Sequence, residues 1–498
     1  MSRRLAQLPA DPGALIGLLV AAQVVAWTLA PALTHSAPPL DVVEGYMWGR
    51  EWVLATYKHP ALPSWALEAS RLVAGGIVGW PAYLLSQLFV GAAFLCVYVT
   101  GCDLVGRERA AAGTLLLTGV AFYAWPTPEF NHNVAEMPFW AALPLALWRA
   151  VEGRGVLWWA LAGAVAAGGL YAKLTTALLL LVLAAWMLWD ARARASLATP
   201  GPWVGLAVFA LLAAPLATWL LANDFLPLRY AAARTGQPAG RGVPAFIVSV
   251  LLNLAGMAAM LAIAGLVGRS MTAPPGTEAE PPERRALAFL VFVVAGPLAL
   301  TLAAAIALGS NLKSAWGSSM FNYLGVLAVA LVSARFTPAA LRRLAVCAAV
   351  LIVAVPAGYA AAIAAGPTRE GRPVRVSWPQ AEISRRFLDV WAQATGGRPL
   401  RIVAGDPWIA GLIGVSAPAV PSILTHGNLA LSPWISPVRI AREGMLVVWD
   451  ARLGGTPPHL APLVGSRTVR EERFRVGRGG GQDAVVVGYA VVLPAPAP

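Results

Sequence analysis

Long apolar runs constrain the fold of this chain more than any other feature. Each is close to the roughly 20 residues that a helix needs to cross the hydrocarbon core of a bilayer. Of the 498 residues, 58% are hydrophobic and only 12% are charged, whereas about a quarter of the residues in soluble domains are charged. We therefore expect a polytopic α-helical membrane protein with about eleven transmembrane helices. These helices are expected near residues 13–34, 78–102, 109–125, 136–150, 156–171, 173–189, 202–222, 243–267, 286–308, 317–334 and 341–365.

The basic residues lie mainly in the short loops between these runs. The formal net charge is +13, but arginine in short loops keeps those loops on the cytoplasmic side of the membrane. We therefore assign the excess charge to topology and expect no nucleic-acid partner. The start MSRR is compatible with a cleaved signal peptide, but the apolar run after it is longer than a signal requires. We expect an uncleaved first helix and a cytoplasmic N-terminus.

The acids and histidines gather on the opposite side. The insert DVVEGYMWGREWVLATYKHPALPSW, from Asp41 to Trp65, is charged within an apolar chain, so its ionisable groups must be solvated, paired or functional. All five histidines also fall on this side, and we expect the chemistry there. Some cations break the positive-inside pattern, either as tolerated loop charges or, as we favour, as ligands of an anionic lipid headgroup. They are Lys58, Lys173, Arg229, Arg234, Arg241 and Lys313.

Two acids of this insert are candidates for proton transfer. Asp41 and Glu44 are three residues apart, so they share one face if the segment is helical. Neighbouring carboxylates at a low-dielectric boundary can have separated pKa values, which leaves one of them as a base near neutral pH. The alternative is that Asp41 only caps a short interfacial helix, because D-x-x-E alone is a weak signal.

The segment YKHPAL presents three potential phosphate ligands in a row. Tyr57, Lys58 and His59 supply a phenol, an ammonium group and an imidazole, and Pro60 disfavours helix before it. Such donors can hold a phosphate. Alternatively, Tyr57 and Lys58 anchor the chain at the level of the lipid headgroups. The neighbouring carboxylates favour the functional interpretation.

The loop PTPEFNHN carries further polar side chains between two expected helices. Glu129, Asn131, His132 and Asn133 offer the donors and acceptors that sugar hydroxyls need. A zinc site from His132, His59 and a carboxylate is conceivable, but no ligand pair has a diagnostic spacing. We therefore expect no metal and no other cofactor, with a divalent metal as the minor alternative.

The composition changes at about residue 366, where the apolar runs shorten. Strand-like pieces at 400–404, 445–449 and 484–492 and a helical piece at 380–394 predict a small α/β domain. The expected division is a membrane domain over residues 1–365, with a first periplasmic loop at 36–77, and an extracytoplasmic α/β domain over 366–498. AGDPW (residues 404–408) and SPW (residues 432–434) are either sugar contacts or, as we favour, structural turns.

The order of these features resembles the dolichyl-phosphate-mannose protein mannosyltransferase superfamily. A short tail, one helix, the D-x-x-E loop with its downstream KHP, the E-x-N-x-N loop, many helices and a terminal domain follow in that order. The bacterial branch that includes the lipid A aminoarabinose transferases is most similar, in motifs over residues 36–190 and in architecture thereafter.

This resemblance implies a GT-C fold, with Asp41 as the catalytic base and Glu44 as a supporting acid. The aminoarabinose enzymes commonly have lysine directly before the proline, where this chain has His59 with Lys58 one position earlier. The distal cations that hold the lipid phosphate in the family would correspond to Arg229, Arg234, Arg241 or Lys313.

The expected function is inverting transfer of a sugar from a polyprenyl-phosphate donor to an acceptor hydroxyl. The acceptor would be an envelope glycolipid, glycan or protein at the periplasmic face of the inner membrane. No Walker or Rossmann fingerprint is present in the sequence, as expected for a donor without a nucleotide. The main alternative is a transporter or flippase of a lipid-linked sugar, although such proteins place ionisable groups within their spans and often show repeated halves. An inactive scaffold for the terminal domain is a third possibility.

Overall fold

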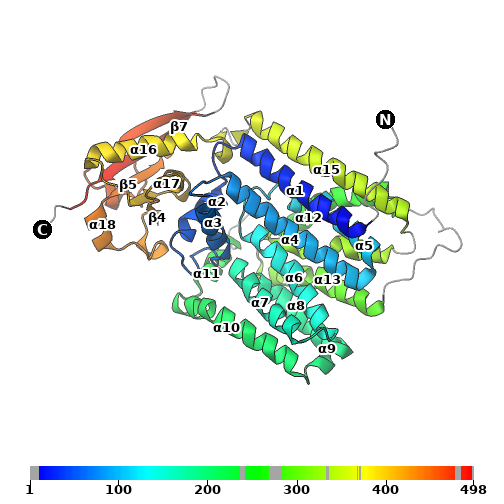
Figure 1. Ribbon diagram of the computed structural model, residues 1–498. Helices are drawn as coiled ribbons and strands as arrows, with labels where there is room; N and C mark the ends of the chain where they lie inside the picture. The colour runs from blue at the N-terminus through cyan, green and yellow to red at the C-terminus, as the bar shows by residue number, and fades with distance from the viewer. Residues whose placement is uncertain are drawn as a thin grey trace.

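The computed structural model describes residues 11–235, 242–267, 283–332, 336–366, 368–369, 372–476 and 484–495. A body of helices lies beside a C-terminal group of strands and helices, and α2 and α3 lie between the two (Figure 1). The helices of the body are α1 (Pro12–Thr34), α2 (Leu40–Gly49), α3 (Leu62–Val73), α4 (Trp80–Val105), α5 (Arg107–Leu116), α6 (His132–Val151), α7 (Val156–Ala172), α8 (Thr176–Trp189), α9 (Ala191–Ser196), α10 (Pro200–Ala222), α11 (Leu226–Thr235), α12 (Gly242–Ile263), α13 (Arg284–Leu308), α14 (Leu324–Leu331) and α15 (Pro338–Ala364).

Long apolar helices form most of the body. Within the described residues, six are long and apolar enough to cross a membrane: α1, α4, α10, α12, α13 and α15. The helices α7 and α8 are apolar but shorter. Along α1, α4 and α15, which lie side by side (Figure 1), many apolar side chains remain exposed, as is typical of a surface covered by lipid.

Two segments that were expected to be single spans are broken. The expected helix 109–125 is α5 followed by the 3₁₀ turns η1 (Leu117–Gly119) and η2 (Ala121–Tyr123), and the expected helix 317–334 is a 3₁₀ segment, η3 (Ser314–Phe321), followed by the short α14. Close packing of the backbone and buried polar side chains compensate for the breaks. A Cβ on Gly325 would lie 2.1 Å from the Gly113 carbonyl oxygen, so α5 and α14 pack backbone to backbone.

Buried polar side chains form hydrogen bonds at these breaks. Gln23 donates through Nε2 to the Tyr123 carbonyl oxygen over 3.0 Å. The Tyr123 hydroxyl donates to Asn322 Oδ1 over 2.7 Å, and Asn322 Nδ2 donates to the Met137 carbonyl oxygen over 3.0 Å. Irregular backbone is tolerated at membrane depth only where the protein itself supplies such partners. The apolar runs in the sequence did not reveal these breaks.

The C-terminal part contains a five-stranded mixed sheet with the strand order β4-β3-β5-β7-β6. β3 pairs in parallel with β4 and β5, and β7 pairs antiparallel with β5 and β6. The parallel strands are buried on both faces, as is usual when helices cover a sheet. Its elements are β1 (Thr368–Arg369), β2 (Arg372–Pro373), η5 (Arg375–Ser377), α16 (Gln380–Thr395), β3 (Ile402–Gly405), α17 (Pro407–Val415), β4 (Ser422–Thr425), η6 (Leu429–Leu431), α18 (Pro437–Glu443), β5 (Met445–Asp450), η7 (Ala451–Leu453), α19 (Ala461–Val464), β6 (Arg470–Arg475) and β7 (Ala484–Val492).

The sequence located four of these elements, and the ones it missed include two strands of the five-stranded sheet. The pieces expected at 380–394, 400–404, 445–449 and 484–492 correspond to α16, β3, β5 and β7. The strands β4 and β6 were not expected. β4 has only four residues, and β6 carries the charged sequence REERFR at the edge of the sheet, so neither has the apolar run that marks a strand.

Direct contacts join the two parts. Gly411 of α17 lies against α2, where an added Cβ would meet Val43 Cγ1 at 2.4 Å. The backbone N–H groups of Ser36 and Ala37, which follow α1, both donate to the Val376 carbonyl oxygen. The position of α2 is therefore fixed by the body and by the C-terminal part together.

Candidate active site

Asp41 lies in the first turn of α2, at the end of the body that faces the C-terminal part. Asn131 donates through Nδ2 to Asp41 Oδ2 over 2.8 Å, and the Asp41 backbone N–H donates to Glu129 Oε1 over 3.0 Å. The N-cap position of α2 is occupied by Pro39, without a side-chain capping bond. The alternative in which Asp41 only caps a helix is therefore wrong. Its carboxylate is held by a side chain from a loop about ninety residues further along the chain.

Glu44 lies one turn further along α2 and pairs with Lys58. Lys58 Nζ lies 2.5 Å from Glu44 Oε1, and Glu44 is only 4% exposed. Burial lowers the pKa of Lys58, but the Glu44 carboxylate and the Tyr57 hydroxyl more than offset this, so the pKa of Lys58 lies above its usual value. Burial raises the pKa of Glu44, and Lys58 opposes this. We take the pair as ionised because the contact is short and Lys58 remains partly open to solvent.

Aromatic rings surround the Lys58 ammonium group. It lies 5.7 Å from the ring centroid of Trp48, 5.6 Å from that of Tyr57 and 6.0 Å from that of Tyr230. Tyr230 belongs to α11 and packs edge-on against Tyr57. Rings at this distance attract a cation through their negative faces. Lys58 is therefore held in place by groups from α2, from its own loop and from α11.

Glu129 is a buried carboxyl group that titrates near neutral pH. Burial, and then the negative charge of Asp41, raises the pKa of Glu129 to about 7, while the Asp41 N–H and Arg375 oppose the shift. The loop before Glu129 is fixed from α4, because Gln87 Nε2 donates to Thr127 Oγ1 over 2.9 Å. A carboxyl group whose pKa lies near neutral pH can both give and take a proton there.

The two histidines of the predicted site stack on each other. The rings of His59 and His132 have centroids 3.6 Å apart. Burial, together with the positive charges of Lys173 and Lys58, lowers the pKa of His59 to about 3. A neutral His59 can give a phosphate one N–H but no charge. Among the described residues, no group of three or more His, Cys, Asp and Glu side chains is arranged to hold a metal ion.

Asn133 has an unused hydrogen-bond acceptor. Its Oδ1 is buried and has no hydrogen-bond partner within the described part of the chain. Asn131, two residues earlier, caps α6 with its own Oδ1 by accepting from the backbone N–H groups of Asn133 and Val134. A buried amide oxygen without a partner costs free energy unless a ligand or water satisfies it.

The structure separates the four distal cations of the sequence prediction. Lys313 lies near the centre: partial burial and the charges of Arg234 and Lys58 lower its pKa, and the Asp41 carboxylate opposes this. Arg234 therefore lies beside Lys313 at the edge of the site. Arg229 is exposed on α11 next to Tyr230. Arg241 lies outside the described residues.

Glu136 and Tyr230 were not predicted as site residues, and Lys173, which was favoured as a ligand of the lipid headgroup, is paired with Glu136 instead. Lys173 Nζ lies 3.0 Å from Glu136 Oε1, in an ion pair that is almost completely buried, and Thr175 Oγ1 donates to the other oxygen of Glu136. The position of Lys173, against the positive-inside pattern, was the available signal for this pair. Tyr230 carried no such signal, because a tyrosine in an expected loop is common.

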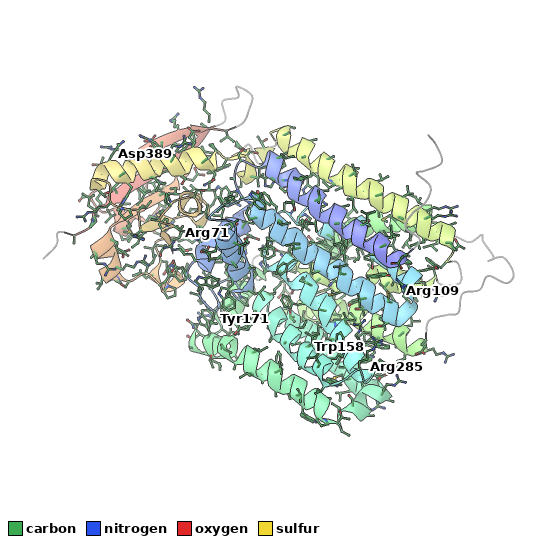
Figure 2. All side chains as sticks on the ribbon, viewed as in Figure 1. Arg71, Arg109, Trp158, Tyr171, Arg285 and Asp389 are labelled. Atoms are coloured by element: carbon green, nitrogen blue, oxygen red, sulfur yellow. The ribbon has the colours of Figure 1, made fainter. Side chains whose placement is uncertain are left out.

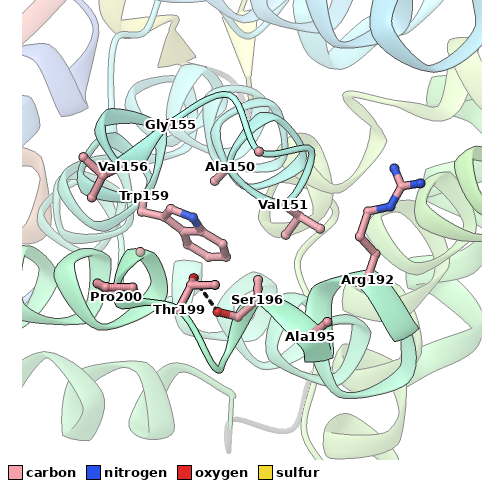
Figure 3. A pocket seen from close by; sticks show the side chains of 12 residues that line it. Ala150, Val151, Gly155, Val156, Trp159, Arg192, Ala195, Ser196, Thr199 and Pro200 are labelled. Atoms are coloured by element: carbon pink, nitrogen blue, oxygen red, sulfur yellow. Dashed lines mark hydrogen bonds between the residues drawn. The ribbon is translucent and has the colours of Figure 1, made fainter.

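Two hollows lie away from this cluster. One, of about 480 Å³, lies between the adjoining ends of α6, α7, α9 and α10 and is lined by Trp159, Arg192, Ser196 and Thr199, among others (Figure 3). The other, of about 350 Å³, is almost entirely apolar and shares Trp159 with the first. Neither contains a carboxylate, so neither competes with the cluster around Asp41 as a place for proton transfer.

Comparison with known proteins identifies the fold. The family described as dolichyl-phosphate-mannose-protein mannosyltransferase matches residues 58–219. The crystal structure of ArnT from Cupriavidus metallidurans bound to undecaprenyl phosphate superposes with a TM-score of 0.65 at 15% identity, over 95% of this chain and 97% of that one. The chain has the GT-C fold of ArnT. The apo state of the same ArnT gives a TM-score of 0.62 at 13% identity, with the same coverage.

These comparisons confirm the resemblance that the sequence motifs indicated. The match to a GT-C membrane protein also agrees with the apolar helices of the body, and the chain is a multi-pass membrane protein. No curated protein matches the sequence. The shared fold spans nearly the full length of both chains, including the C-terminal part. The roles of single residues do not follow from a fold shared at this identity, so they depend on the geometry described above.

Proposed function

We propose that the chain is an inverting glycosyltransferase that moves a sugar from a polyprenyl-phosphate donor to an acceptor hydroxyl. One observation carries the proposal. The Asp41 carboxylate is bonded to a neutral amide instead of a cation, and it lies in one cluster with the paired Lys58 and the exposed Lys313. This reaction needs a base that takes the acceptor proton and nearby cations that stabilise the anionic leaving group.

In the proposed reaction, Asp41 takes the proton of the acceptor hydroxyl. The hydroxyl oxygen attacks the anomeric carbon from the face opposite the phosphate, and the bond from that carbon to the phosphate oxygen breaks with its electron pair. The polyprenyl phosphate leaves with one more negative charge, which Lys58 and Lys313 stabilise. Tyr57 and His59 add hydrogen-bond donors, and Arg229, Arg234 and Arg241 are proposed as outer ligands of the lipid phosphate.

The E-x-N-x-N loop is proposed to position the sugar and the acceptor. Glu129, His132 and Asn133 face this cluster, and the unpartnered Oδ1 of Asn133 is suited to a sugar hydroxyl. Asn131 orients Asp41, and Glu44 holds Lys58. No metal or other cofactor enters the proposed mechanism.

The proposed location is the extracytoplasmic face of the inner membrane. The arginine-rich loops lie at the end of the body remote from Asp41, where Figure 2 shows Arg109 and Arg285, and this supports a cytoplasmic placement of that end. The ArnT crystal structure contains undecaprenyl phosphate, which supports a lipid-linked donor here. The acceptor is proposed to be an envelope glycolipid, glycan or protein.

The decisive experiment is mass spectrometry of envelope glycolipids, glycans and proteins from cells with the chain, without it, and with Asp41→Asn. We expect one species to lose the mass of a sugar when the chain is absent or carries Asp41→Asn. A flippase would instead change the leaflet of the donor, and the activity would survive Asp41→Asn. That outcome would overturn the proposed function.

A further inference from the structure

The parallel strands of the C-terminal sheet end in polar residues that no part of the mechanism above uses. In the pairing of β3 with β4, Gly405 lies opposite Thr425, so Asp406 and His426 are the next residues on two adjacent strands. Adjacent strands are about 4.8 Å apart. In open sheets with parallel strands, ligands bind outside the carboxyl ends of those strands.

His426 is held in a conformation that presents its side chain at this edge. Its φ is 52°, in the left-handed region that residues other than glycine seldom adopt. Its backbone N–H donates to the Gly405 carbonyl oxygen over 2.7 Å, which ties the turn to the end of β3. The imidazole is exposed, and the ring of His459 lies edge-on to it with the centroids 5.9 Å apart. Such strain at a surface position persists only where the surrounding structure fixes it.

Two oxygen atoms at this edge have no hydrogen-bond partner among the described residues. Asp406 uses Oδ1 to accept from the N–H groups of Trp408 and Ile409, while its Oδ2 makes no hydrogen bond to any described residue. Thr425, the last residue of β4, is 1% exposed, and its Oγ1 has no hydrogen-bond partner within the described ranges. A buried hydroxyl without a partner indicates a site that water or a ligand completes.

The edge faces the cluster around Lys58. α17 begins directly after Asp406 and packs on α2, where Gly411 lies against Val43, the neighbour of Glu44. Consistent with this placement, burial and the Asp406 carboxylate both raise the pKa of Glu44. Burial lowers the pKa of His426, and the positive charges of His459 and Lys58 contribute to that shift while Asp406 opposes it. The sheet edge and the candidate active site therefore adjoin.

We propose that Asp406, His426 and His459 form a subsite for the carbohydrate part of the acceptor. This inference rests on the proposed function, because the edge adjoins the cluster around Lys58 to which that function assigns sugar transfer. A carboxylate accepts hydrogen bonds from hydroxyl groups, and imidazole rings form hydrogen bonds with them as well. The carboxylate repels a phosphate, and the described residues include no metal-binding cluster at this edge. Sugar hydroxyls therefore fit this edge better than an anion or a cation does.

The test measures binding of defined probes to the full-length chain in nanodiscs. Mannotriose and triacetylchitotriose represent free glycans, Kdo2-lipid A represents a lipid-linked glycan, and undecaprenyl phosphate probes the donor side. His426→Asn removes the imidazole but tolerates the left-handed backbone, and Asp406→Asn removes the charge but keeps an N-cap for α17. Asp389→Asn is the matched control, because Asp389 is exposed on the outer helix α16 (Figure 2).

We expect at least one glycan to bind, and the His426 and Asp406 variants each to weaken that binding roughly tenfold. Asp389→Asn should leave it unchanged, and all three variants should bind undecaprenyl phosphate as the parent chain does. Whether the free or the lipid-linked glycan binds identifies the source of the acceptor. The subsite is refuted if no glycan binds, or if all variants bind glycans equally. Failure of the parent chain to bind undecaprenyl phosphate, with glycan binding intact, would instead count against the proposed function.

Discussion

The two ends of the helical body use charged side chains in opposite ways. At the end remote from the C-terminal sheet, Arg285 bonds to both Asp190 and Glu152 and lies over the rings of Trp148 and Trp186. Asp103 accepts from two arginines there. At the opposite end, Asp41 and Glu129 are bonded to neutral N–H groups.

The difference separates structural charges from functional ones. A carboxylate that already binds two guanidinium groups has little capacity left for a ligand, and its ion pairs fix the loops at that end of the body in place. A carboxylate held by one amide keeps a lone pair for a proton. Carboxylates of the same residue types therefore have different roles, which only their partners reveal.

The largest expected effect comes from Asp41. Asp41→Asn should reduce sugar transfer by about a thousandfold or more, because general base catalysis contributes on the order of 10²–10⁴. The bond from Asn131 can re-form with the new side chain, so the fold should survive. Transfer assays on purified protein and its thermal unfolding check both points. At the other end, Asp103→Asn should leave the transfer rate of the folded protein unchanged.

The second-largest effect is expected at Lys58, whose ammonium group is surrounded by aromatic rings. Lys58→Met should lower the transfer rate by roughly a hundredfold, because the departing phosphate loses a preorganised positive charge. Lys58→Arg should restore part of the rate, since it restores the charge. A Lys58→Met variant with normal kcat and normal donor affinity would remove Lys58 from the mechanism.

The pH dependence of transfer tests Glu129. Its carboxyl group, with a pKa of about 7, ionises as the pH rises from about 6 to 8, and the new negative charge lies beside the carboxylate that is proposed to take the acceptor's proton. We expect the rate to rise by roughly tenfold through pH 7, and Glu129→Gln to flatten that part of the profile. A parent profile that is already flat there would contradict the assignment.

Glu129 also affects stability. Its pKa is higher in the folded chain than the usual value of 4.5, so the stability it contributes is fully present below about pH 4.5. That contribution is lost as the pH rises through about 7. The melting temperature of the parent chain in detergent should fall over this interval more than that of Glu129→Gln.

The smallest expected effect lies at the remote end. Asp190→Asn should destabilise the protein by about 1–2 kcal/mol, because it leaves Arg285 with fewer partners at a site that is only partly screened by solvent. The transfer rate per folded molecule should not change. Thermal unfolding and transfer activity, measured on the same sample, test this prediction. If Asp190→Asn lowered the transfer rate without lowering the stability, the distinction between structural and functional charges at the two ends would be wrong.

The sequence alone predicted the class of the protein and most of the residues that lie together at the candidate site. Apolar runs of spanning length, the placement of the arginines and the D-x-x-E, KHP and E-x-N-x-N segments were sufficient, because each of these signals is local in the chain. The resemblance in those motifs was confirmed by a fold shared over 95% of the chain.

Only the tertiary structure decided which side chains contact one another. It bonded Asn131 to Asp41, placed Tyr230 over Lys58, paired Lys173 with Glu136 and brought Asp406 and His426 to the same edge. It also broke two expected helices, where buried side chains donate hydrogen bonds to backbone carbonyl groups and glycine lets the helices pack closely. Local periodicity records which side chains avoid water, but it carries no information on which distant groups will meet. Those contacts depend on how the helices and the sheet pack against one another.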